Sequence, residues 1–108
     1  MALQVTELSL ELIEILRPLV SRIKAKDKSL ADQITRSASS IALNLGEAEL
    51  SDPGNRRARF FTAAGSAGET YSAVRVAIAW RYFAAREGEP ALALLQRIMA
   101  ILWKLTRG

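Results

Sequence analysis

The sequence predicts an all-α protein, an antiparallel up-and-down four-helix bundle. Apolar residues recur at three- and four-residue steps in four stretches of the chain, which is the spacing of a buried helical face. Short segments rich in Gly, Pro, Ser and Asp separate the four stretches, and the sequence contains neither an internal repeat nor a low-complexity tract. Helices joined by short loops pack as antiparallel neighbours, so these observations together predict the bundle.

The first predicted helix covers the N-terminal stretch of the chain. One apolar stripe contains Val5, Leu8, Leu12, Ile15, Leu19 and Ile23, and a second contains Leu10, Ile13, Leu16 and Val20. Such a wide apolar arc predicts burial on more than one side, in the bundle or against another subunit. Pro18 lies inside the pattern and predicts a kink or a break, because proline removes one backbone donor and crowds the preceding turn.

The second predicted helix covers residues 30–47. It follows a turn in which Asp27 or Ser29 is expected to act as a cap. Its core-facing residues share one narrow arc: Leu30, Ile34, Ala38, Ile41 and Leu45. A polar stripe runs beside that arc, so Ser37 and Asn44 are expected to be half-buried and hydrogen-bonded.

The third predicted helix covers residues 56–83 and follows the strongest turn signal in the chain, residues 46–55. Asp52 is expected to cap it, with Pro53 at the first helical position. A core seam is predicted at Phe60, Ala64, Ala67, Tyr71, Val74 and Ile78. Gly65 and Gly68 each cost about 1 kcal/mol relative to alanine in a helix, and we expect a close approach to the second helix to offset this cost.

The fourth predicted helix starts at Glu89 and Pro90, after a break at residues 86–90. Its apolar residues again cover a wide arc: Leu92, Leu94, Leu95, Ile98, Met99, Ile101, Leu102 and Leu105. Lys104 and Arg107 suit the negative end of this helix.

Composition narrows the possible functions. A chain of 108 residues suits a single domain, residues 1–108. The chain has no cysteine and no histidine, so we expect no disulfide, no metal site of the usual kind, no cofactor and no histidine base. No apolar run is long enough to span a bilayer, and the first residues lack the basic region of a secretory signal. We therefore expect a cytoplasmic, non-enzymatic protein without a membrane role.

The excess of basic residues suggests a nucleic-acid partner. The chain has 15 Lys and Arg against 11 Asp and Glu, a net charge of +4, and most of the bases are arginines, which suit bidentate contact with phosphate. The candidate nucleic-acid-binding residues are Lys24, Lys26, Lys28, Arg36, Arg56, Arg57, Arg59, Arg75 and Arg81. Most aromatic residues fall on core seams, so contact with the phosphate backbone is predicted without stacking platforms. Arg56 and Arg57 alternatively pair with the nearby acids.

The polar stripe of the two central helices has three possible roles. Its members are Gln33, Ser37, Ser40, Asn44, Glu47, Ser66 and Glu69. We favour a structural network that fixes the register of two closely packed helices. A network at a subunit interface is the functional alternative, whereas an acid-base pair of Glu47 and Glu69 would need a pocket and substrate-orienting groups.

The same residues carry a family resemblance. The pattern runs from Leu30 and Gln33 through Arg36-Ser37-Ala38, Ser40-Ile41, Asn44 and Glu47 to Ala63, Gly65-Ser66 and Glu69. It resembles the bacterial four-helix-bundle proteins encoded by intervening sequences in large-subunit ribosomal RNA genes, whose relatives include accessory proteins of diversity-generating retroelements. The resemblance implies a homopentameric ring that acts with RNA or DNA, with a reverse transcriptase or with another protein. A purely structural or protein-partner adaptor is the alternative function.

Overall fold

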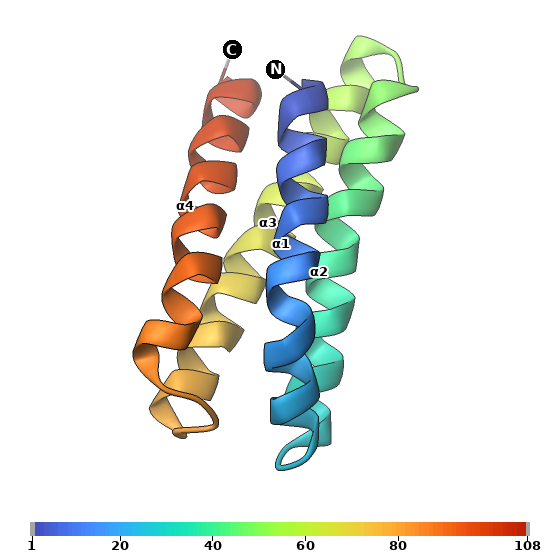
Figure 1. Ribbon diagram of the computed structural model, residues 1–108. Helices are drawn as coiled ribbons and strands as arrows, with labels where there is room; N and C mark the ends of the chain where they lie inside the picture. Colours follow the sequence, from blue (N-terminus) through green and yellow to red (C-terminus); the bar gives the residue numbers. More distant parts are fainter. Residues whose placement is uncertain (1, 108) are drawn as a thin grey trace.

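The chain folds into four long helices, as predicted. The computed structural model describes the backbone of residues 2–107 and the side chains of residues 4–107. The helices are α1 (Ala2–Lys24), α2 (Lys28–Glu49), α3 (Pro53–Ala79) and α4 (Ala85–Arg107), and the described residues contain no strand. Figure 1 shows consecutive helices running in opposite directions, so that both ends of the chain and the α2–α3 turn lie at one end of the bundle. The α1–α2 and α3–α4 turns lie at the other end. The all-α bundle is thereby confirmed.

The core lies along the shared axis of the four helices. The predicted arc of α2 is buried in full, and on α3 Phe60, Ala67 and Val74 are buried while the other seam residues pack against the core. Each helix packs against its two neighbours, and the α1–α4 contact is the thinnest of the four. Seven large apolar residues are exposed among residues 4–107, and of these only Leu10 and Trp103 lie on α1 and α4.

The helix caps follow the sequence. The carboxylate of Asp27 accepts a hydrogen bond from the Leu30 N–H at 3.0 Å, and that of Asp52 accepts one from the Asn55 N–H at 3.0 Å. Pro53 is the first residue of α3. The N–H groups in the first turn of a helix have no acceptor within the helix, and a carboxylate at the N-cap supplies one. This explains why α2 and α3 begin directly after Asp27 and Asp52.

The predicted start of the fourth helix at Glu89 and Pro90 was wrong, because α4 begins five residues before Pro90. A break at Pro18, one of the two predicted alternatives, was also wrong, because helix α1 continues through that residue. Both prolines are exposed, so each ring and the carbonyl that it frees lie on the solvent side of a long, packed helix. Burial of the flanking turns offsets the single lost hydrogen bond.

The expected role of the α3 glycines was also wrong. A Cβ atom built on Gly65 or Gly68 meets nothing within 4 Å, so neither glycine permits a close approach of α2. They lie on the outer side of α3 instead. Helix α3 also ends at Ala79, earlier than predicted, and residues 80–84 form the connection to α4.

Candidate nucleic-acid interface

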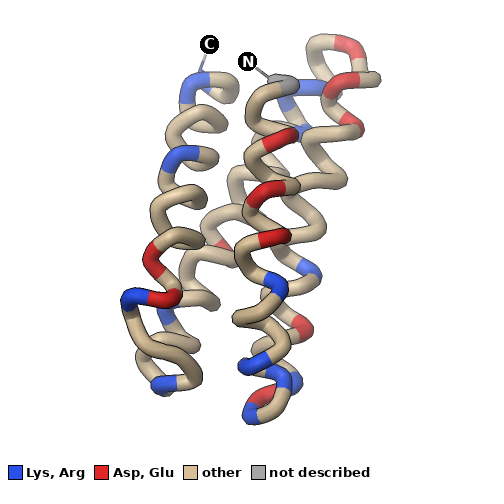
Figure 2. The backbone as a smooth tube through the Cα atoms, in the orientation of Figure 1, with Lys and Arg blue, Asp and Glu red and all other residues tan. Residues whose placement is uncertain are grey.

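The candidate basic residues lie at opposite ends of a bundle that is 42 Å long. Lys24, Lys26 and Lys28 surround the α1–α2 turn, and Arg81 lies in the α3–α4 turn at the same end. The group of Arg56, Arg57 and Arg59 lies in the first turns of α3, at the other end. Figure 2 shows basic residues gathered around the two turns at the lower end. The structure therefore places seven of the nine predicted residues in two groups, and the other two, Arg36 and Arg75, lie within α2 and α3.

The arginines near the α2–α3 turn bind the chain itself. Arg56 donates hydrogen bonds to the carbonyls of Ala48, at 3.2 Å, and Ser51, at 3.1 Å. Arg57 donates two to the Thr106 carbonyl, at 2.9 and 3.2 Å. The last carbonyls of a helix lack helical partners and carry partial negative charge, so a guanidinium satisfies both needs. These two arginines join helix ends rather than pairing with the nearby acids.

The other candidate basic residues differ in whether their side chains already have a partner within the chain. Arg59 donates to the Asn44 Oδ1 at 3.3 Å, Arg36 pairs with Glu69 at 3.2 Å, and Lys28 pairs with Asp32 at 2.9 Å. The Arg75 guanidinium lies 6.0 Å from the centre of the Tyr71 ring.

Within the described part of the chain, the side chains of Lys24, Lys26 and Arg81 have neither an ion pair nor a hydrogen bond, and Arg86 at the start of α4 shares this state. We call these four residues the basic tip. Arg86 was not predicted, because its place at this end of the bundle depends on where the α3–α4 turn lies relative to the α1–α2 turn.

Contacts between the two turns hold the basic tip together. The Tyr82 hydroxyl donates to the Asp27 carboxylate at 3.0 Å, which joins the α3–α4 turn to the α1–α2 turn. Arg22 forms a short ion pair with Glu87, which joins α1 to α4. The hydrogen bond from Arg22 and one from the Ala84 N–H lower the pKa of Glu87, whereas desolvation and the Asp27 carboxylate raise the pKa of Tyr82. Asp27 and Glu87, two acids near the tip, are thus already paired.

The end of α3 has a defined shape. The Arg81 N–H donates to the Ile78 carbonyl and the Tyr82 N–H donates to the Ala77 carbonyl, the two bonds of a Schellman motif. Arg81 takes the left-handed conformation of this motif, with φ of 64°. Glycine is the usual residue at that position because it has no Cβ.

Aromatic side chains are more exposed than we predicted. The relative exposures are 66% for Trp80, 58% for Trp103 and 52% for Phe61. Trp80 lies within the basic tip's turn, at the C-cap of α3. The predicted core seam of the third helix ends at Ile78, and Trp80 lies beyond it.

The structure brings part of the polar stripe together. The Ser40 and Ser66 hydroxyls lie 2.8 Å apart, and the Asn44 amide donates to the Ser40 carbonyl and hydroxyl. Ser37 is fully buried rather than half-buried, and its hydroxyl lies 2.7 Å from that of Thr70. Thr70 was missed, although its spacing from Ala63, Ala67 and Val74 places it on the buried side of α3.

The remaining stripe residues do not join this network. The side chains of Gln33 and Glu47 make no hydrogen bond within the described residues, and Glu69 is engaged by Arg36. Every buried side-chain nitrogen and oxygen that the structure describes has a hydrogen-bond partner. No group of three or more acidic residues in residues 2–107 is arranged to hold a metal ion.

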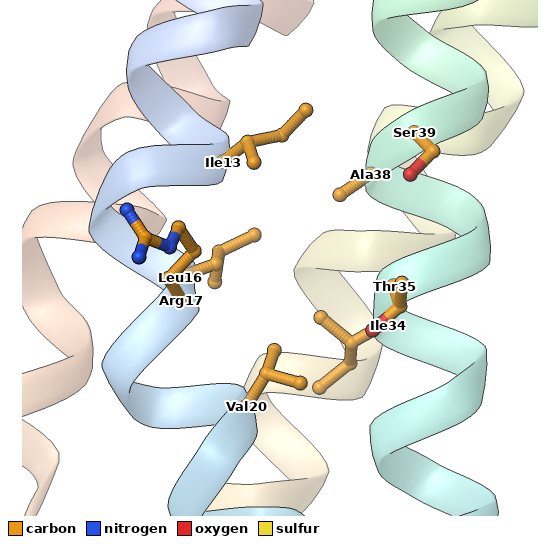
Figure 3. Close-up of a pocket in the computed structure, with 8 residues that line it drawn as sticks. All are labelled: Ile13, Leu16, Arg17, Val20, Ile34, Thr35, Ala38 and Ser39. Carbon is orange, nitrogen blue, oxygen red and sulfur yellow. The ribbon is translucent and has the colours of Figure 1, made fainter.

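A cavity of about 150 Å³ lies between α1 and α2. Figure 3 shows its lining, which is mostly aliphatic: Ile13, Leu16, Arg17, Val20, Ile34, Thr35, Ala38 and Ser39. Arg17, its single charged residue, pairs with Glu14 at 3.0 Å. The cavity holds no acid, base or nucleophile pair, so it offers no reaction chemistry.

Comparison with known proteins identifies the family. The model of the 23S rRNA-intervening sequence protein family matches residues 1–104. The chain belongs to this family. Among solved structures, it is similar to a protein of unknown function from the S23 ribosomal protein family of Bacteroides thetaiotaomicron, with a TM-score of 0.86 and 24% identity. That match covers 96% of this chain and 99% of the other, and it shows a shared fold. No curated protein matches the chain.

These findings confirm the family resemblance that the two central helices suggested. The family description and the structural neighbour name no enzymatic activity. No helix among residues 2–107 is long and apolar enough to cross a membrane.

Proposed function

We propose that this intervening-sequence protein is a non-enzymatic, oligomeric helical module that binds nucleic acid, or a protein that handles nucleic acid, through the basic tip. The observation that carries the proposal is the set of four basic side chains, at one end of the bundle, that form neither an ion pair nor a hydrogen bond within the described residues. Phosphate groups attract such bases without needing sequence-specific contacts. The arginines at the opposite end already serve helix ends, which makes them weaker candidates.

Two charge-matched double variants test this proposal. Lys24→Ala with Lys26→Ala removes two charges from the basic tip, whereas Arg97→Ala with Lys104→Ala removes two exposed, unpaired charges from α4. Binding of a fluorescent oligonucleotide is measured by anisotropy between low and physiological salt. We expect the tip variant to bind more weakly and to lower the slope of log K against log salt by up to about 2, near one per lost phosphate contact.

The control variant should stay close to the wild-type protein in both affinity and salt slope. Absence of binding at low salt, or binding that ignores added salt, would rule out phosphate recognition. Equal losses in the two variants would show that net charge acts without any special role for the tip.

Oligomerisation is part of the same proposal. The family resemblance implies a five-fold ring, in which each basic tip would be repeated around the axis. The outer side of α3 supports an interface between copies, because Phe61 and Val76 are exposed on either side of Gly65, Gly68 and Ser72. Light scattering measures the mass directly, and a strictly monomeric mass would remove the ring.

A structural or protein-partner adaptor is the second candidate function. The same uncharged strip of α3 favours it, since large apolar residues on a surface commonly mark contacts between proteins. The adaptor would assemble normally yet bind no oligonucleotide at low salt, so light scattering and anisotropy together separate the two candidates.

A further inference from the structure

Trp80 is a large aromatic side chain that the fold leaves in solvent. Its neighbours in the turn are engaged: Phe83 is buried in the core and Tyr82 binds Asp27. Trp80, by contrast, remains 66% exposed. Tryptophan side chains are buried on average, because their large apolar area makes burial favourable.

The backbone around Trp80 is held firmly in place. The Trp80 N–H donates to the Val76 carbonyl at 3.0 Å, and the next two N–H groups bond back to Ile78 and Ala77 at 2.9 and 3.0 Å. The indole therefore projects from a fixed turn. A rigid platform loses little conformational freedom when a ligand binds to it.

The other exposed rings differ from Trp80 in one respect. The Arg107 guanidinium lies 3.4 Å from the centre of the Trp103 ring, and that of Arg57 lies 5.2 Å from the centre of the Phe61 ring. In the part of the chain that the structure describes, no cation lies over the Trp80 ring. Of the three exposed aromatic side chains, only that of Trp80 thus has its face free of a cation.

The charges around Trp80 favour a polyanion. Lys24 and Lys26 lie next to Asp27 in sequence, and the Tyr82–Asp27 hydrogen bond joins the α1–α2 turn to the α3–α4 turn. Arg81 lies in the α3–α4 turn, and Arg86 follows it. The nearby Asp27, Asp32 and Glu87 are all paired. Glu89, one turn into α4, is the remaining acid of this stretch without an ion pair or a hydrogen bond. Four basic side chains of the basic tip also have neither, so unpaired positive charges outnumber unpaired negative ones there.

Arg81 supplies an independent indication of function. A residue with a Cβ is disfavoured in the left-handed conformation, and glycine would satisfy the same Schellman motif without this penalty. An arginine kept in a conformation that favours glycine points to a role for its side chain, and it is adjacent to Trp80.

We propose that Trp80 stacks on an unpaired base while the basic tip contacts the flanking phosphates, so that the ligand is a single-stranded nucleic acid. This inference rests on the proposed function and names its substrate class. An exposed aromatic ring surrounded by basic side chains is the arrangement that binds single-stranded nucleic acids, because every nucleobase offers a π face for stacking. In a duplex those faces are covered by neighbouring base pairs, so a duplex would gain only the phosphate contacts.

Substitution of each tryptophan in turn tests the stacking step. Trp80→Ala should weaken binding of a single-stranded oligonucleotide by roughly 5- to 100-fold, the range that stacking of one base supports. Trp80→Phe should restore part of the affinity. Trp103→Ala, which removes an equally exposed tryptophan, should change affinity less than about twofold and is the matched control. Urea denaturation of all three variants confirms that they fold.

Fluorescence gives a direct second readout. The chain has two tryptophans, so the Trp103→Phe variant reports on Trp80 alone. Single-stranded RNA, single-stranded DNA and a duplex of the same sequence are titrated in turn at fixed low salt. We expect either single strand, or both, to quench Trp80 emission with the midpoint found by anisotropy, and the duplex to bind more weakly with little quenching.

Three results would overturn the inference. These are an unchanged single-strand affinity in Trp80→Ala, bound oligonucleotide with unaltered Trp80 emission, or equal effects on single strand and duplex. In each case salt-dependent binding would persist, so the proposed function would survive. Failure of the wild-type protein to bind any oligonucleotide at low salt would instead remove both this inference and the proposed binding of nucleic acid.

Discussion

Replacement of Gly65 and Gly68 by alanine should stabilise the isolated bundle. Both glycines lie in the middle of α3, and a Cβ atom at either position meets no neighbouring atom within 4 Å. Alanine therefore adds no steric conflict, while it removes the entropic cost of glycine in a helix.

The expected gain follows from helix propensity alone. Glycine is about 0.8–1.0 kcal/mol less favourable than alanine in a helix interior, so the two substitutions together should raise the free energy of unfolding by about 2 kcal/mol. For a domain of this size each substitution should raise Tm by about 4–8 °C. Urea denaturation followed by circular dichroism at 222 nm measures both effects, at a concentration where light scattering finds a monomer.

Gly88→Ala is the matched comparison. Gly88 is also helical, but it is buried, and its added Cβ would lie 2.8 Å from Ile78 Cδ1 and 2.9 Å from Phe83 Cε1. The gain in propensity is the same, so the difference between this variant and Gly65→Ala isolates the packing term. Overpacking typically costs about 1–3 kcal/mol, and we expect a difference of that size.

A loss of stability in Gly65→Ala or Gly68→Ala under monomeric conditions would refute the reasoning, because it would mean that another part of the chain approaches α3 there. A loss confined to concentrations at which copies associate has a different meaning. It would place a second copy against the outer side of α3, since the added methyl groups would then obstruct close packing between helices.

Four further outcomes follow from the structure. Thr70→Val should lower the free energy of unfolding by about 1 kcal/mol in urea denaturation, and adding Ser37→Ala should cost less than the sum of the single changes, because both partners of the 2.7 Å hydrogen bond are then gone. Arg81→Gly should raise stability by up to about 1 kcal/mol while weakening oligonucleotide binding, and a loss of stability would contradict the left-handed conformation at φ 64°. The pKa of Glu87 is lowered from its ordinary value of 4.5, so the ionised carboxylate contributes stability above pH 4.5, and this contribution is lost as pH falls through the folded-state pKa. Glu87→Gln should therefore make the free energy of unfolding less dependent on pH in the acid range. The raised pKa of Tyr82 acts at the opposite end, with stability present below its ordinary 10.0 and lost as pH rises through the folded-state pKa, so Tyr82→Phe should flatten the alkaline limb.

The helices and their caps were predictable because they depend on local chemistry. Asp27 and Asp52 cap their own helices within three residues, and the spacing of Ile34, Ala38 and Ile41 defines a buried face without reference to the rest of the chain. These features need only neighbours in sequence. The family pattern in the two central helices was recognisable for the same reason.

The outward direction of Gly65 and Gly68 was not predictable from periodicity. The third helix contains many small residues, so its buried and exposed faces differ little in hydrophobicity. Thr70 is buried, whereas Phe61 is exposed, although phenylalanine is normally buried more often than threonine. A break at Pro18 and a helix start at Pro90 were wrongly predicted, because a sequence gives the cost of a proline but not the packing of the turns around it.

The number of arginines in the sequence likewise did not indicate which of them bind other parts of the chain. At the α2–α3 end, Arg56 and Arg57 donate to carbonyls of α2 and α4, a use that depends on where those helices happen to end. At the other end, Lys24 and Arg81 find no such carbonyl or carboxylate. Loss of Arg57 should therefore lower stability with little direct effect on a ligand at the tip, whereas loss of Lys24 should lower affinity with little effect on stability. The basic residues at the two ends thus have different proposed roles, and variants at one end and at the other can test these roles independently.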